Sequence, residues 1–318
     1  MSAFNEASDY DNFFDTKLMP LLEQLKSESQ TANAWGISII ISGIAGFASF
    51  FAVQADHLKY SGGTLITFFI ILLIISVYQY ARYTDRFTDD FKSTLIKEII
   101  CHVQPDVLYK PDNSISQTEY VTSSLIRYRY AYFEGSDYIE GNFNNVSFHC
   151  SQVHTQTDDG GARSIEQPTI FKGLFLVAKI NSRFSGCSYV WDYNAIQLGA
   201  SIMDEAYRLL PMPDVMNVHL NDLQFDKRFQ VCSTDTYEAT EILQTISTSK
   251  ILSLLDQIQR PFNFSFVLGN CYVAIPFEDD IFGPTVNVPG DKEETKLYFN
   301  SVNLIFKIIE QLELDKLQ

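Results

Sequence analysis

The stretch AWGISIIISGIAGFASFFAV, residues 34–53, contains no charged side chain. At about 1.5 Å of rise per residue, a helix of this length covers the roughly 30 Å hydrocarbon core of a bilayer. A second uncharged run, residues 61–81, is of similar length and consists largely of Leu, Ile, Phe and Val. Helices that are apolar on every side need lipid or a much larger protein around them. The sequence therefore predicts a two-span transmembrane hairpin over residues 34–81.

The basic residues around the two runs predict how the hairpin is oriented. They are Lys17 and Lys26 before the first run, Lys59 between the runs, and Arg82, Arg86, Lys92 and Lys97 after the second. Because Lys and Arg are enriched on the cytoplasmic side, both termini are expected in the cytoplasm and the short loop outside. A cleaved signal peptide is not expected, since 33 mostly polar residues precede the first run.

Small residues recur every four positions in the first run, at Ser38, Ser42 and Gly46. Such a stripe lets another helix approach closely in the membrane. One interpretation is that the two spans pack on each other through it. The other is that the stripe joins two copies of the chain in a homo-oligomer.

The segments that flank the hairpin have helical periodicity. Leu and Phe side chains repeat at helical spacing within residues 1–33, which predicts an amphipathic N-terminal helix. An apolar stripe also continues through residues 82–104, so a juxtamembrane helix is expected to extend the second span as far as Pro105. The remainder, residues 105–318, is predicted to form one acidic cytoplasmic domain.

Within residues 105–318 the patterns alternate between strands and helices without a regular repeat. Hairpins are predicted over 138–150, with Asn144-Asn145 in the turn, and over 264–276, with Gly269-Asn270 or its neighbours in the turn. Residues 170–180, apolar on both alternating faces, predict a central strand, and residues 187–191 a further one. Predicted helices cover 116–126, 196–210, 239–243, 249–259 and 297–312. The expected fold is α+β, with a mainly antiparallel sheet and a C-terminal helix.

Charge and cysteine usage restrict the function classes. The chain has a net charge of −16, and residues 104–318 hold 28 of the 39 acidic residues but 16 of the 23 basic ones. An acidic domain without a basic cluster repels phosphate backbones, so no nucleic-acid partner is expected. The five cysteines are scattered and form no C-x-x-C pair, which favours reduced thiols in a reducing compartment.

Five segments after the second run resemble a known family. They are YKPDNSIS (109–116), YIEGNF (138–143), FKGLFLVAKINSRFSG (171–186), FQVCSTDTYEATEIL (229–243) and FSFVLGNCYVAIP (264–276). In this order they resemble the uncharacterised bacterial two-span membrane proteins grouped as domain of unknown function 3137. The resemblance implies a bacterial inner-membrane protein and no particular reaction.

Two groups of residues invite a chemical interpretation and also have a structural one. Asp235 and Glu238 could share a substrate as two carboxylates, but an acidic N-cap with Glu three residues later is a helix capping box. His149, Cys150 and His154 are soft metal ligands, but in a strand the first two point to opposite faces and the spacing is not that of a zinc site. The structural interpretations are preferred.

The acidic loop Glu278, Asp279 and Asp280 lacks the ligand spacing of an EF-hand and is predicted to be a solvated turn. The chain has no G-x-S-x-G, Gly-rich phosphate loop or H-E-x-x-H motif. The glycines and aromatics of 141–143 and 171–186 are predicted to belong to the core. No cofactor or metal is expected, and no catalytic residue is identified.

These observations favour a membrane-anchored cytoplasmic interaction or regulatory protein over an enzyme. Its expected partners are the lipid bilayer and a protein of unknown identity, with a homo-oligomer as an open alternative. The second hypothesis is a membrane-bound hydrolase-like enzyme that uses carboxylates of the cytoplasmic domain, such as Glu238 or Glu278.

Overall fold

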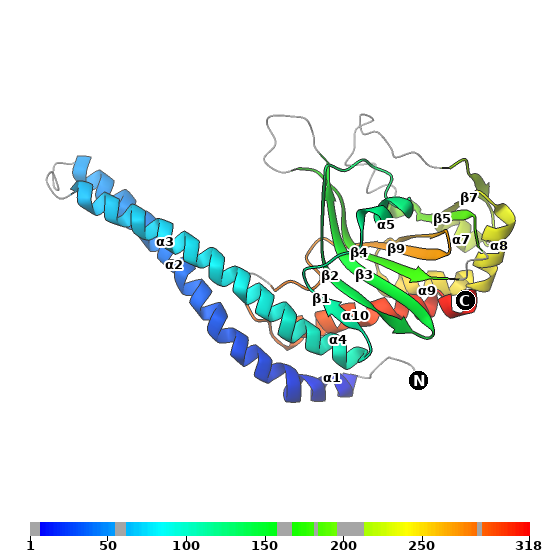
Figure 1. Cartoon of the computed structure of the whole chain (residues 1–318), viewed down its shortest axis with the longest axis horizontal. Helices are drawn as coiled ribbons and strands as arrows, with labels where there is room; N and C mark the ends of the chain where they lie inside the picture. Colours follow the sequence, from blue (N-terminus) through cyan, green and yellow to red (C-terminus); the bar gives the residue numbers. More distant parts are fainter. Residues whose placement is uncertain (1–6, 55–61, 158–166, 181–183, 196–212, 285–287) are drawn as a thin grey trace. The chain divides into compact units, whose positions relative to one another are not determined.

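The computed structural model of the chain describes residues 7–54, 62–157, 167–180, 184–195, 213–284 and 288–318 (Figure 1). The chain forms two compact units. The helical unit contains residues 5–98 and 282–297, and the sheet unit contains residues 99–281 and 298–318.

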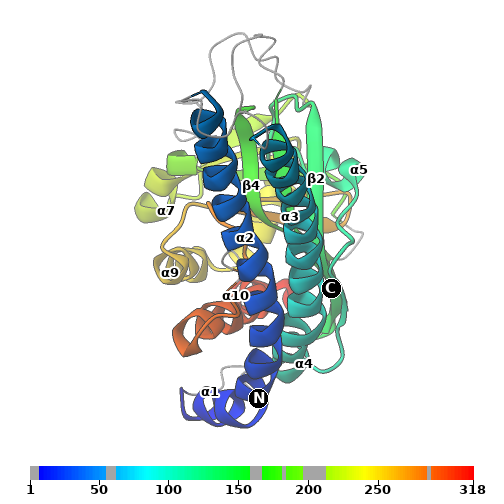
Figure 2. The same cartoon turned by 90° about the vertical axis from the view of Figure 1, so that its left-hand side faces the viewer.

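Two long apolar helices dominate the helical unit. The first consists of α1 (Ala7–Phe13), the π-helical η1 (Phe14–Leu18) and α2 (Met19–Gln54). The second consists of α3 (Gly62–Asp90), the π-helical η2 (Phe91–Ile96) and α4 (Lys97–Val103), of which residues 99–103 belong to the sheet unit. α2 and α3 run side by side (Figure 2). Both helices are long and apolar enough to cross a membrane, and only 11% and 6% of their most apolar windows are buried.

The described part of the sheet unit holds a nine-stranded sheet in the order β1-β2-β3-β4-β9-β8-β5-β7-β6. Every pair of neighbouring strands is antiparallel. The strands are β1 (Leu108–Lys110), β2 (Tyr132–Phe143), β3 (Val146–Gln156), β4 (Thr169–Lys179), β5 (Cys187–Asp192), β6 (Met216–Val218), β7 (Phe229–Ser233), β8 (Asn263–Val267) and β9 (Asn270–Pro276). The helices are α5 (Gln117–Thr122), α7 (Leu223–Arg228), α8 (Thr236–Thr245), α9 (Thr248–Ile258) and α10 (Lys292–Gln311), with the short 3₁₀ helix η3 (Leu314–Leu317) after them. The predicted α+β class and the antiparallel sheet are confirmed.

The central strand β4 is buried on both faces, as its continuous apolar pattern predicts. On one face Phe175 packs against Tyr120 of α5, with ring centroids 5.4 Å apart. On the other face Phe148 of β3, which pairs with Ala178 of β4, contacts Phe306 of α10 at 5.7 Å. The sheet is therefore the middle layer of the unit, with apolar side chains on both sides.

Both predicted hairpins are present, and both have two-residue turns. Asn144 and Asn145 join β2 to β3 with φ of 49° and 66°, and Leu268 and Gly269 join β8 to β9 with φ of 50° and 75°. Positive φ at both central positions gives the turn a twist that matches the strands. The second turn falls one residue before Gly269-Asn270, within the predicted neighbourhood.

Some of the sequence predictions need correction. The helix after Ser116 has the predicted capping box but ends at Thr122 rather than near residue 126. Ser123 Oγ donates to the Tyr120 carbonyl, and Ser124 has φ of 51°, so the helical path stops there. The sequence prediction also missed the short elements β1, β6, α7 and β7. The predicted helix 196–210 lies outside the described residues.

Candidate functional site

A cleft of about 1030 Å³ opens on the sheet unit, on the face of the sheet where Tyr120 packs against Phe175. Five adjacent strands contribute to its wall, through Phe171 of β4, Ala274 of β9, Asn263 of β8, Trp191 of β5 and Cys232 of β7. Loops complete it at residues 125–128, Val215, 259–261 and 277–278. The antiparallel order β4-β9-β8-β5-β7 is what brings these distant segments to one place.

Most of the described cleft wall is apolar. Its larger apolar side chains are Leu125, Ile126, Ile170, Phe171, Trp191, Val215 and Phe277. The Trp191 ring is stacked on Tyr189, with centroids 5.3 Å apart and an angle of 7° between the planes. A concave wall of this kind is typical of small-molecule binding sites, whose volumes run from about 300 to 1,000 Å³.

The charges in the described cleft wall are mainly positive. They are Arg127, Lys172 and Arg260, opposed by the single carboxylate of Glu278. The Arg260 guanidinium lies over the Phe277 ring, 4.9 Å from its centroid. The Nε atom of Arg127 is buried and has no hydrogen-bond partner among the described residues. In a chain with a net charge of −16, this concentration of cations is distinctive.

The titratable groups around the cleft are not arranged for nucleophilic chemistry. Burial, and to a lesser extent the neighbouring Cys187, raise the pKa of Tyr189 to about 12. Burial also raises the pKa of the Cys232 thiol, whose Sγ donates to Asn217 Oδ1 at 3.1 Å. A thiol with a raised pKa is a poor nucleophile at neutral pH. The described cleft wall contains no histidine and no second carboxylate to pair with Glu278.

The predicted pair Asp235 and Glu238 has a structural role. Asp235 is the N-cap of α8, and its Oδ1 accepts from the Tyr237 and Glu238 backbone N–H groups at 2.9 and 3.0 Å. The reciprocal half of the predicted capping box is wrong: the Glu238 carboxylate accepts from the Ser185 and Gly186 N–H groups instead. The Asp235 N–H donates to Ser233 Oγ. Neither carboxylate lines the cleft.

The other predicted polar residues are separated from one another. His149 Nε2 lies 2.7 Å from Glu119 Oε1, while Cys150 is fully buried, which raises the pKa of its thiol. His154 Nε2 lies 3.0 Å from Thr169 Oγ1. The loop residues Glu278, Asp279 and Asp280 are exposed. Among the described residues no group of three or more His, Cys, Asp or Glu side chains could hold a metal ion.

The three small residues of the first apolar helix are placed within the helical unit. Ser38 Oγ lies 2.8 Å from Ser76 Oγ of α3, and Ser42 is buried. A Cβ atom added to Gly46 would lie 3.5 Å from the Cβ of Phe69. Within one chain, Ser38 is thus hydrogen-bonded to α3, Ser42 is buried and Gly46 lies close to α3. This favours the interpretation that the two spans pack on each other.

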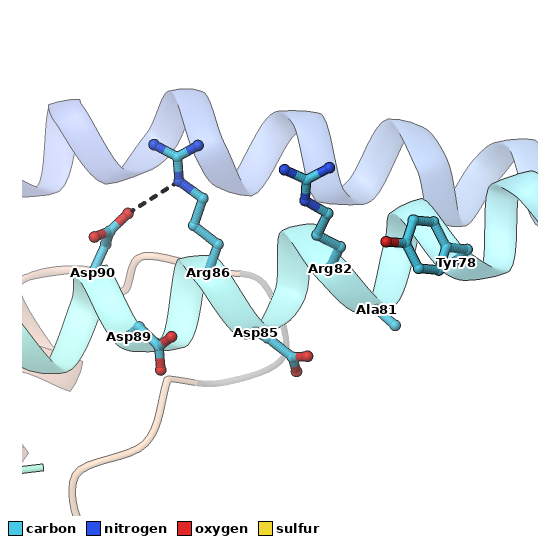
Figure 3. A pocket seen from close by; sticks show the side chains of 7 residues that line it. All are labelled: Tyr78, Ala81, Arg82, Asp85, Arg86, Asp89 and Asp90. Atoms are coloured by element: carbon cyan, nitrogen blue, oxygen red, sulfur yellow. Dashed lines mark ion pairs between the residues drawn. The ribbon is translucent and has the colours of Figure 1, made fainter. Parts of the chain in front are cut away.

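A smaller hollow of about 450 Å³ lies along α3 of the helical unit (Figure 3). Its wall comes from one helix, through Tyr78, Ala81, Arg82, Asp85, Arg86, Asp89 and Asp90. Arg86 forms ion pairs with Asp90 at 3.6 Å and with Glu28 of α2 at 3.9 Å. Since most of these side chains are exposed and the charges are mixed, this hollow is a weaker candidate than the cleft.

Of the polar residues in the described cleft wall, the sequence analysis singled out Glu278 but none of the cations, and it did not single out Trp191. Arg127, Lys172, Arg260 and Trp191 stand far apart in the chain and belong to no motif. The only local signal is that cations are scarce in an acidic chain, which does not indicate which of them converge.

Comparisons with known proteins show what the chain is similar to but do not indicate a function. The crystal structure of the mycobacterial trehalose monomycolate transport factor A, TtfA, is similar at a TM-score of 0.30 and 7% identity. The comparison covers 70% of this chain and 93% of that one. No curated protein matches the sequence. Residues 169–314 match the model of the family described as Protein of unknown function (DUF3137), so the resemblance found in the sequence is confirmed over that region.

Proposed function

We propose that the chain is a membrane-anchored, non-enzymatic interaction or regulatory protein of the bacterial inner membrane. In this proposal α2 and α3 cross the bilayer as a hairpin, both termini are cytoplasmic, and the sheet unit is a cytoplasmic binding domain whose site is the cleft.

The observation that carries the proposal is the large apolar surface of the two long helices. Side chains such as Ile40, Ile44 and Phe47 of α2 and Phe68 and Ile74 of α3 are 58–67% exposed. Exposed apolar area of this extent in water costs about 25 cal/mol per Å². Lipid removes this cost. A helix is also stable in lipid because its backbone N–H and C=O groups are hydrogen-bonded to one another.

The orientation rests on the distribution of basic residues. Arg82 and Arg86 follow the second apolar run directly and are exposed (Figure 3). Six Lys and Arg residues flank the outer ends of the two runs, against Lys59 alone between them. This asymmetry supports a cytoplasmic position for both termini.

A binding role is favoured over catalysis by the cleft itself. It is large and apolar, and its described wall has one carboxylate and no histidine. General acid–base catalysis needs positioned groups with suitable pKa values. The two carboxylates named for the enzyme hypothesis do not meet, because Glu278 lines the cleft and Glu238 is hydrogen-bonded to the backbone at Gly186.

Two measurements test the proposal. In a bacterial host, the full chain should stay in the membrane pellet after carbonate washing. A reporter that is active only in the cytoplasm should be active when it is fused to either terminus. Release by carbonate, or a periplasmic terminus, would refute the anchor or its orientation. Cross-linking in intact membranes should then recover one recurring protein partner; recovery of the same proteins with an unrelated two-span control would contradict the interaction role.

A further inference from the structure

The cleft combines an apolar wall with converging positive charge. We propose that it binds an anionic single-chain lipid, with the acyl chain against the apolar wall and a carboxylate or phosphate head group at Arg127. This inference rests on the proposed function, since it names the ligand class of the binding domain.

The apolar wall sets the first requirement on the ligand. At about 1030 Å³ the cleft lies at the upper end of the size range of small-molecule sites. Phe171, Trp191 and Phe277 give it large aromatic surfaces. Because such surfaces gain free energy in proportion to the apolar area they bury, an inorganic ion or a small polar metabolite would leave most of the wall uncovered.

The charges set the second requirement. A cleft wall with three cations and one carboxylate attracts anions although the chain as a whole is acidic. The buried Nε of Arg127 has no hydrogen-bond partner among the described residues, and a buried donor without a partner costs about 1–3 kcal/mol. A ligand oxygen would satisfy this donor. Charge-assisted bonds from guanidinium to carboxylate or phosphate are among the strongest in proteins.

Arg260 is a second cation in the cleft wall that can bind an anionic ligand. Its guanidinium stacks on Phe277, which uses the face of the group and leaves its N–H edge to bind an anion. The same arginine thus extends the apolar wall and carries charge. A wall of this kind matches a molecule with both an acyl chain and an anionic head.

Trp191 provides a direct reporter of the site. The chain has two tryptophans, Trp35 and Trp191, so the Trp35→Phe variant fluoresces from Trp191 alone. The full chain with this change would be placed in phosphatidylcholine nanodiscs and titrated with oleate, lysophosphatidate, monoolein and inorganic phosphate. Empty nanodiscs correct for partition of each compound into lipid.

Oleate and lysophosphatidate are expected to change the Trp191 emission saturably, and monoolein, which has the chain without the charge, to bind about tenfold more weakly. Arg127→Gln should weaken oleate binding about tenfold relative to the same protein with Arg127. Arg129→Gln is the matched control, because Arg129 is exposed, two residues away and not part of the cleft wall, and it should bind oleate unchanged. Arg260→Gln, at an exposed position, gives a second variant if Arg127→Gln does not fold.

Three results would overturn the inference: no saturable signal with either anionic lipid, equal affinity for monoolein, or binding of inorganic phosphate as tight as that of oleate. An equal loss in Arg127→Gln and Arg129→Gln would also overturn it, since the effect would then be general electrostatics. None of these results alters membrane anchoring or partner recovery, so failure of this inference is distinguishable from failure of the proposed function.

Discussion

The Glu238 carboxylate accepts hydrogen bonds from the Gly186 backbone N–H, whose nitrogen lies 3.0 Å from Oε1 and 3.2 Å from Oε2. The Ser185 N–H donates to the same carboxylate at 3.1 Å. Glu238 lies in the first turn of α8, and Gly186 lies just before β5. The side chain therefore ties a helix to the chain entering a strand 52 residues earlier.

Replacing Glu238 is thus expected to change stability. Glu238→Ala leaves the Ser185 and Gly186 N–H groups without this acceptor and should lower the free energy of unfolding by about 1–2 kcal/mol. Glu238→Gln keeps one acceptor oxygen and should cost less. Thermal unfolding of the solubilised full chain measures both, with Asp256→Asn, an exposed carboxylate of α9, as the control. A loss for Asp256→Asn as large as that for Glu238→Ala would contradict the assignment.

The Glu238 contact shows which features can be predicted from one sequence. The Asn144-Asn145 turn and the Asp235 N-cap are local, since the residue types that favour them stand within two or three positions. The partner of Glu238 is not local, so a pattern of residues that fits a capping box gave the wrong partner. Short elements such as β6 have too few residues to show a periodicity.

The same reasoning explains why the cleft was not predicted. Arg127, Lys172 and Arg260 come together only because β4, β9, β8, β5 and β7 lie in that order in the sheet. The sequence predicts most of these strands but not their order. The long apolar runs are predictable because their signal extends over about 20 residues within one segment.

Gly173 of β4 is expected to tolerate no side chain. A Cβ atom there would lie 2.1 Å from the Ile275 carbonyl oxygen and 2.9 Å from the Pro276 Cα, both backbone atoms of the neighbouring strand β9. Gly173→Ala should therefore destabilise the chain by about 3 kcal/mol, since β4 and β9 would have to separate. The measurement is the thermal midpoint of the sheet unit's near-ultraviolet circular dichroism. An unchanged midpoint would show that the two strands can move apart freely.

Glu119 is expected to make stability depend on pH. Burial opposes its ionisation, but hydrogen bonds from Ser116 and the proximity of His149 lower the pKa of its carboxyl below the usual 4.5. Because the pKa is lower in the folded state, the stabilisation is present above the unfolded value of 4.5 and is lost as the pH falls through the folded value. The contribution of Glu119 should therefore shrink below pH 4.5.

Two variants separate the parts of this effect. Glu119→Gln preserves the acceptor of the capping box but removes the charge, so it should cost less than about 1 kcal/mol at pH 7 and less than that at pH 3. Glu119→Ala also removes the cap and should cost more at both pH values. Urea unfolding at pH 7 and pH 3 measures the differences, with the exposed Glu134→Gln as control. A cost for Glu119→Gln that is equal at the two pH values would contradict the assignment.

Gly46 and Gly43 of α2 offer a matched test of how the small-residue stripe is used. A Cβ atom at Gly46 would lie 3.5 Å from the Phe69 Cβ, whereas one at Gly43 would meet nothing within 4 Å. If the stripe packs the two spans of one chain together, Gly46→Leu should force α2 and α3 apart and lower the thermal midpoint, since close packing of small residues holds membrane helices together. The mass of the solubilised protein, measured by light scattering, should not change. Gly43→Leu should alter neither quantity, because its side chain enters open space. A smaller mass for Gly46→Leu at an unchanged midpoint would instead assign the stripe to a contact between two copies of the chain.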